Sequence, residues 1–181
     1  MELDDEDDEL ADLEEAVMAV AWEMSQDRSM ALPAVEVDER IRRSSLDEED
    51  KDYEVAWGIR KAAGPESGRL VVVESLIGAE RSKLVGTLSF LYLDRGYTMG
   101  CVAVTFGALS NLANDCANVT HAYELDAFID AAAQGSLELS KPTLLFVTEG
   151  DLWTLQQSLS FMQLAAGNAV KVVFVGKGYE L

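Results

Sequence analysis

The sequence predicts an α/β protein, a three-layer sandwich in which helices cover both faces of a mostly parallel sheet of four or five strands. Two kinds of segment point to this fold. Short continuous apolar runs such as residues 70–73 and 143–148 are typical of strands buried on both faces of a parallel sheet. They alternate with longer segments of helical composition, which is the order expected of strand-helix-strand units. An acidic helix is expected to precede them.

The N-terminal segment, residues 3–27, has no Gly or Pro and is rich in Glu, Ala, Leu and Met, so it is expected to be a helix. Met18 and Trp22 form one apolar strip on it. A second, separate seam repeats at heptad spacing, and its members are Leu10, Leu13, Val17, Val20 and Met24. A helix with two apolar faces needs covering on more than one side, either by its own domain or by a partner chain. The seam and Trp22 are therefore candidate partner-binding residues.

The next segment, residues 28–52, contains Pro33, a Ser-Ser pair and an acidic run, which indicates a linker or a short helix. The expected organisation is an acidic helical arm with its linker over residues 1–52 and an α/β domain over residues 53–181. That domain opens with a short amphipathic helix over residues 53–63.

Two strand-helix-strand units recur along the domain. The first is expected to use strands at 70–73 and 100–106 around a helix at 79–95, and the second strands at 143–148 and 170–176 around a helix at 151–166. At a constant offset of 71, nine of 24 aligned positions are identical. Duplication and the shared demands of a buried core both account for this. Between the units we expect one helix over residues 123–133, and a short strand or coil near 119–122.

Charge is unevenly distributed. The net charge is −19, of which residues 1–52 carry −15 and residues 53–181 carry −4. A nucleic-acid binder needs a basic footprint, so direct nucleic-acid binding is not expected, and the same acidity disfavours an anionic membrane surface. The chain opens with acidic residues in place of a targeting segment and has no apolar run long enough to cross a bilayer. We therefore expect a cytoplasmic protein with a basic protein partner.

A ligand site, if the domain has one, is expected beyond the carboxyl ends of the parallel strands. Carboxylates there could act in acid-base chemistry or hold Mg²⁺, although Asp151 could equally cap its helix and the others could be solvated loop residues. No Walker or GxGxxG pattern accompanies them, so no cofactor is predicted. The candidate strand-end residues are Glu74, Ser75, Gly78, Thr105, Thr148, Glu149, Gly150 and Asp151.

The thiols and the single histidine are weak catalytic candidates. Cys116 and His121 lie five residues apart, so a Cys/His nucleophilic pair is conceivable. A structural zinc site would need four ligands, and no metal is predicted. Cys101 falls at the start of an apolar strand, where a buried, inert thiol is expected.

The second unit resembles a known family. Residues 144–148, 159–162 and 170–178 together resemble the opening βαβ unit of DsrE-like sulfur-relay proteins, over about 38 residues. The resemblance implies an α/β fold, an oligomer and a sulfur-carrying cysteine, with Cys116 or Cys101 as the candidates. In that family the cysteine lies in a later segment, which has no counterpart after Gly178.

The leading functional hypothesis is a non-catalytic interaction or assembly component with an acidic docking arm. The alternatives are a DsrE-like sulfur carrier or thiol enzyme, and a small-molecule or nucleotide-binding domain. We also expect a homo-oligomer or a subunit of a complex, because the apolar strand at 170–175 is expected to be an exposed edge that something must cover.

Overall fold

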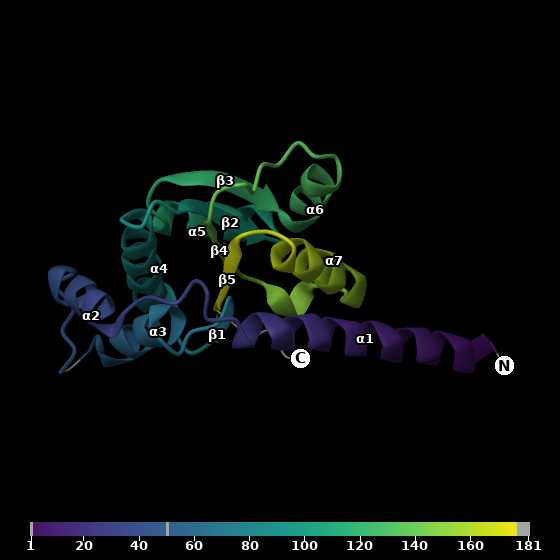
Figure 1. The fold of residues 1–181 in the computed structure, drawn as a ribbon, viewed down its shortest axis with the longest axis horizontal. Coiled ribbons are helices and arrows are strands. Elements are labelled where there is room, and N and C mark those ends of the chain that lie inside the picture. The colour runs from purple at the N-terminus through teal and green to yellow at the C-terminus, as the bar shows by residue number, and fades with distance from the viewer. Residues whose placement is uncertain (1, 50, 177–181) are drawn as a thin grey trace.

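The computed structural model describes residues 2–49 and 51–176, and it confirms the predicted α/β fold class (Figure 1). Five strands form one parallel sheet in the order β1-β5-β4-β2-β3. The strands are β1 (Leu70–Val73), β2 (Thr98–Ala103), β3 (Val119–Glu124), β4 (Thr143–Val147) and β5 (Val170–Val175). The helices are α1 (Glu2–Gln26), α2 (Ala34–Arg43), α3 (Tyr53–Ala63), α4 (Gly78–Leu93), α5 (Phe106–Asp115), α6 (Leu125–Ala133), the short η1 (Gly150–Leu152) and α7 (Leu155–Ala166).

The strand order corrects one expectation. The strand at 170–175 is β5, and it lies inside the sheet, paired with β1 through Leu70 and Val172 and with β4 through Thr143 and Val170. The crossover from β1 to β2 leaves room for two strands, which β4 and β5 fill when the chain returns. The expected exposed β5 edge is therefore wrong, and the edges of the sheet are β1 and β3.

The two faces of the sheet carry separate apolar cores. Helices α2, α3, α4 and α5 pack on one face around Ile59, Leu88 and Phe146, and helices α6 and α7 cover the other around Phe128 and Phe161. The direction of travel along the sheet reverses after β3, so right-handed crossovers place the later helices on the opposite face. The two similar strand-helix-strand units therefore differ in how their strands are placed in the sheet. The strands β1 and β2 of the first unit are not neighbours, whereas β4 and β5 of the second unit are.

One helix was missed from sequence. Residues 107–122 were expected to be turn residues with a possible short strand, but α5 occupies Phe106–Asp115 and β3 begins at Val119. Poor helix formers such as Asn111 and Asn114 lowered the helical signal. Burial of Leu109 and Leu112, together with a hydrogen bond from Ala108 N–H to the Thr105 hydroxyl at 3.4 Å, stabilises the helix nonetheless.

Helix α1 is docked by its C-terminal half and extends away from the body at its N-terminal half (Figure 1). Val17, Ala21 and Met24 are buried, and the helix packs on α7 and β1. The backbone N–H of Arg69 donates to the Met24 carbonyl at 2.9 Å. The division of the chain at residue 52 stays a prediction, and α2 also contributes Val37 and Ile41 to the core.

Among the residues that the structure describes, no helix combines the length and the apolar character that a membrane span requires.

Candidate functional site

The carboxyl ends of all five strands lie at one edge of the sheet, where the predicted ligand crevice should be. Strands β2 and β4 are neighbours there, and their following helices, α5 and α7, lie on opposite faces. This is the topological switch point at which open α/β sheets usually bind ligands. The fold therefore puts Thr105 and Thr148–Asp151 at the position that the rule selects.

Glu149 spans the switch point. Its carboxylate accepts hydrogen bonds from the backbone N–H groups of Val104 at 3.0 Å and Thr105 at 2.9 Å, and from the Thr105 hydroxyl at 3.0 Å. The Glu149 backbone is left-handed, with φ of 63°, a conformation that costs free energy for a residue with a side chain. The Val104 and Thr105 amide donors before α5 are thus bound by the protein's own carboxylate.

The other predicted strand-end residues are not brought together into one acidic site. Thr148 and Gly150 are buried, whereas Glu74, Ser75, Gly78 and Asp151 are exposed. Glu74 and Ser75 follow β1, which is separated from β4 by β5. Asp151 lies in η1 and does not cap α7. That helix has a capping box, in which Gln157 N–H donates to the Thr154 hydroxyl at 3.1 Å.

Arg81 is a residue at the carboxyl-end edge of the sheet that the sequence analysis missed. It lies in the first turns of α4, and its Nη1 is 3.6 Å from the position that a Cβ on Gly176 would take. Its Nε is buried and has no hydrogen-bond partner among the residues that the structure describes. An arginine three residues after a candidate strand-end glycine, Gly78, is a weak signal that could have indicated it.

The thiols lie between β2 and α5. Both are buried and reduced, and a hydrogen bond with Cys116, followed by burial, raises the pKa of Cys101. A thiol with a raised pKa carries little thiolate at neutral pH, which disfavours nucleophilic chemistry at Cys101. His121 lies on the edge strand β3, and burial lowers its pKa. Among the described residues, no three His, Cys, Asp or Glu side chains cluster as metal ligands would.

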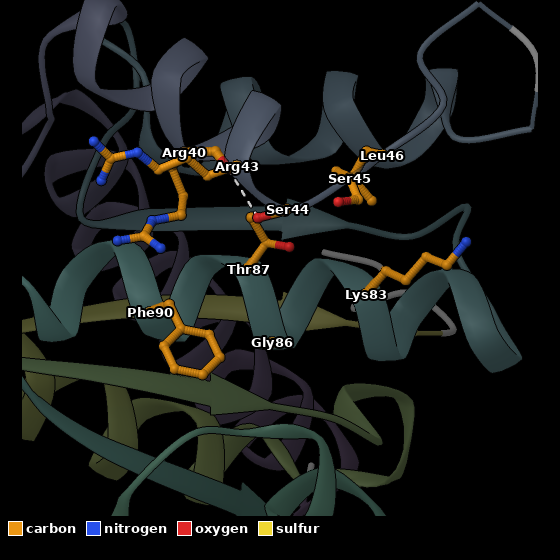
Figure 2. Close-up of a pocket in the computed structure, with 9 residues that line it drawn as sticks. All are labelled: Arg40, Arg43, Ser44, Ser45, Leu46, Lys83, Gly86, Thr87 and Phe90. Carbon is orange, nitrogen blue, oxygen red and sulfur yellow. Dashed lines mark hydrogen bonds between the residues drawn. The ribbon is translucent and has the colours of Figure 1, made fainter.

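A cavity of about 430 Å³ lies between α2, the loop after it, and α4 (Figure 2). Three cationic side chains line it, with hydroxyls between them and an aromatic ring at one end. The lining residues are Arg40, Arg43, Ser44, Ser45, Leu46, Lys83, Gly86, Thr87 and Phe90. Of these, the sequence indicated only the Ser-Ser pair at residues 44 and 45, as part of a linker or short helix.

The predicted partner-binding residues of α1 divide into two sets. Val17 and Met24 are buried, and Leu13 and Val20 are half-buried. Trp22 is 67% exposed, Leu10 53% and Met18, from the second strip, 51%. A shallow apolar groove runs along the exposed face, lined by Ala11, Glu14, Glu15, Met18, Ala19 and Trp22.

Comparison of the sequence with known protein families and with curated proteins finds no match to either.

Proposed function

We propose that this protein is a non-catalytic interaction or assembly component, in which the α/β body is the scaffold and α1 docks a basic amphipathic helix of a partner protein. The observation that carries the proposal is the exposed apolar face of α1. This helix already buries Val17, Ala21 and Met24 against its own body, yet it leaves Trp22 and Met18 open to solvent. Large apolar side chains that gather on one exposed face are typical of interaction sites.

Charge supports a basic partner. The first 27 residues contain twelve acidic side chains and no basic one. Glu14 and Glu15 border the apolar groove beside Met18 and Trp22. A helix with an apolar face between Lys and Arg residues would match this pattern, because complementary charge steers association and fixes register. A second copy of the same acidic helix would instead bring like charges together.

The proposal is tested with two synthetic peptides of identical Leu and Lys composition. One is patterned as an amphipathic helix and the other is scrambled so that it has no apolar face. Binding to the full chain is followed by tryptophan emission, and the Trp22→Phe protein identifies the signal that belongs to Trp22. We expect the patterned peptide to shift Trp22 emission to shorter wavelength and to bind at least tenfold more tightly than the scrambled one.

Two variants separate the groove from the rest of the surface. Met18→Gln should weaken binding of the patterned peptide, whereas Val35→Gln should not, because Val35 is exposed on α2 and lies outside the groove. Binding should also weaken as salt rises, since exposed charges are screened beyond about 8 Å at physiological ionic strength. Equal affinity for both peptides would reduce the interaction to unspecific charge attraction and refute the docking role. Light scattering of the protein alone shows whether a second copy occupies the groove instead.

A further inference from the structure

The cavity between α2 and α4 differs from the rest of the molecule in its charge. The chain has 33 acidic and 14 basic residues, yet the lining contains Arg40, Arg43 and Lys83 and, among the residues that the structure describes, no acidic side chain. These three side chains offer charged N–H donors to an anion that enters the cavity of about 430 Å³. The volume is within the range of small-molecule sites.

Each of the three cationic side chains forms an ion pair with an acidic residue that does not line the cavity. Arg40 pairs with Asp94, Arg43 with Glu39 at 2.6 Å, and Lys83 with Asp52 at 2.8 Å. An arginine has five N–H donors and a lysine three, so these pairs leave donors unused. Asp94 and Glu39 are both about half exposed or more, and exposed ion pairs are weak enough for a ligand to compete with them. Asp52 is buried, but its partner Lys83 is itself 39% exposed. The acids therefore fix the position of the cations without saturating them.

Hydroxyl groups lie between the cations. The Ser44 hydroxyl donates to the Arg40 carbonyl at 2.8 Å, at the C-terminal end of α2 (Figure 2). The Thr87 and Ser45 hydroxyls make no hydrogen bond within the described residues. Ser45 follows the C-cap of α2 and has a left-handed backbone, with φ of 56°, as the residue that ends a helix often does. Free hydroxyls beside guanidinium groups are suitable donors to phosphate oxygens.

The cavity has an apolar end. Phe90 is 51% exposed. In Figure 2 it lies at the end of α4 nearer to Arg40 and Arg43, with its ring below the helix in this view, and Lys83 lies toward the other end of α4. Lys83 and Phe90 are seven residues apart, which corresponds to about 10 Å along a helix. An aromatic wall at one end and a lysine at the other suit an elongated ligand with a planar ring and a phosphate chain.

We propose that this cavity binds a nucleoside diphosphate. The ring lies against Phe90, the first phosphate contacts Arg40 and Arg43 near the hydroxyls, and the terminal phosphate reaches Lys83. The site is on the face of the sheet opposite α6 and α7, whereas α1 packs on α7. It is therefore independent of the docking role proposed for α1, and either can fail without the other.

The test is isothermal titration calorimetry of the full chain with ADP, pyrophosphate and adenosine. We expect ADP to bind more tightly than either fragment. Arg43→Gln should weaken ADP binding by about tenfold, the loss of one charge-assisted contact. Arg42→Gln is the matched control, because it removes the same charge from the same turn of α2 at a residue that does not line the cavity, and it should change affinity by less than about twofold.

Phe90→Ala should weaken ADP binding and leave pyrophosphate binding unchanged. Circular dichroism confirms that each variant is folded. No heat of binding with ADP or pyrophosphate at about 1 mM would overturn the proposal. Equal losses in Arg43→Gln and Arg42→Gln would do so too, because they would show general charge attraction in place of a site.

Discussion

The burial of Lys171 predicts an unusual dependence of the free energy of unfolding on pH. This residue lies on the interior strand β5 and is 0% exposed. Its Nζ donates to the Ser67 hydroxyl at 2.8 Å and lies 5.4 Å from the centre of the Tyr92 ring. No acidic side chain within the described residues forms an ion pair with it. Burial, with a smaller contribution from the positive charge of Arg28, lowers the pKa of Lys171 from 10.5 to about 7.

The sign follows from proton binding. Between pH 7 and pH 10.5 the unfolded chain keeps the Lys171 proton and the folded protein has lost it, so the free energy of unfolding rises with pH across this window. The largest possible slope is about 1.4 kcal/mol per pH unit. His121, whose pKa is lowered, contributes below about pH 6.5, and Cys101 and Tyr92, whose pKa values are raised, contribute above about pH 8.5. Between pH 7 and 8.5 the expected gain is about 2 kcal/mol.

The assay is urea unfolding at pH 7.0, 7.75 and 8.5 on the wild type, Lys171→Met and Lys141→Met. Methionine keeps most of the apolar stem and removes the ionisable group, and Ser67 still donates to the Gly64 carbonyl at 2.6 Å. Lys171→Met should abolish the rise with pH and be more stable than wild type at pH 7, because a buried charge without a partner is costly. Lys141 is exposed, so Lys141→Met should keep the wild-type slope. Parallel curves for wild type and Lys171→Met would refute the reasoning.

Two further predictions concern single contacts. Glu149→Gln should lower the free energy of unfolding by about 1 to 2 kcal/mol, because a neutral amide accepts the Val104 and Thr105 N–H bonds less strongly. Glu138→Gln, at an exposed position, should leave the free energy of unfolding unchanged in the same urea titration. Equal stability of the two variants would mean that the Glu149 contact contributes nothing. Gly68→Ala should cost about 1 to 3 kcal/mol, because a Cβ there would lie 2.1 Å from the Ser25 carbonyl oxygen at the end of α1. Gly107→Ala, with open space around the new Cβ, is its thermal-unfolding control, and a wild-type midpoint for Gly68→Ala would show that α1 is not held against residue 68.

The sequence was sufficient for β1, β2, β4 and β5 but not for the strand order, and it left the segment of β3 as a short strand or coil. The apolar run Leu144–Val147 is uninterrupted because both sides of β4 are buried. In β1, Val71 and Val73 are buried and Val72 is half-buried, so this strand too has an apolar run that is visible in the sequence. Strand order depends on how many strand positions each crossover spans. No pattern within residues 70–103 indicates that β2 lies three positions from β1 in the sheet. The error about β5 followed directly, because a strand late in the chain was assumed to be late in the sheet.

The candidate sites divide in the same way. Thr105, Thr148 and Glu149 could be located by rule, because the carboxyl ends of parallel strands share an edge. The hydrogen bonds that Glu149 makes there could not be predicted, because its bonds to Val104 and Thr105 join segments that are 44 to 45 residues apart in the sequence. The α2–α4 cavity was missed because Lys83 and Phe90 are unremarkable residues of a helix until Arg40 and Arg43 are placed opposite them.

The hydrogen bonds of Glu149 limit the binding of an anionic ligand at the switch point. An anionic ligand at the switch point would have to displace a carboxylate that already accepts two backbone N–H bonds and one hydroxyl, and such charge-assisted bonds are the stronger kind. One donor that remains at that edge belongs to Arg81, whose Nε has no hydrogen-bond partner among the described residues. Exposed apolar side chains remain at that edge, at Ile77, Phe106 and Leu152, and others lie on the outer faces of α1, α2 and α4. The exposed face of α1 and the α2–α4 cavity both lie on helices outside the sheet, and each is testable without disturbing its buried core.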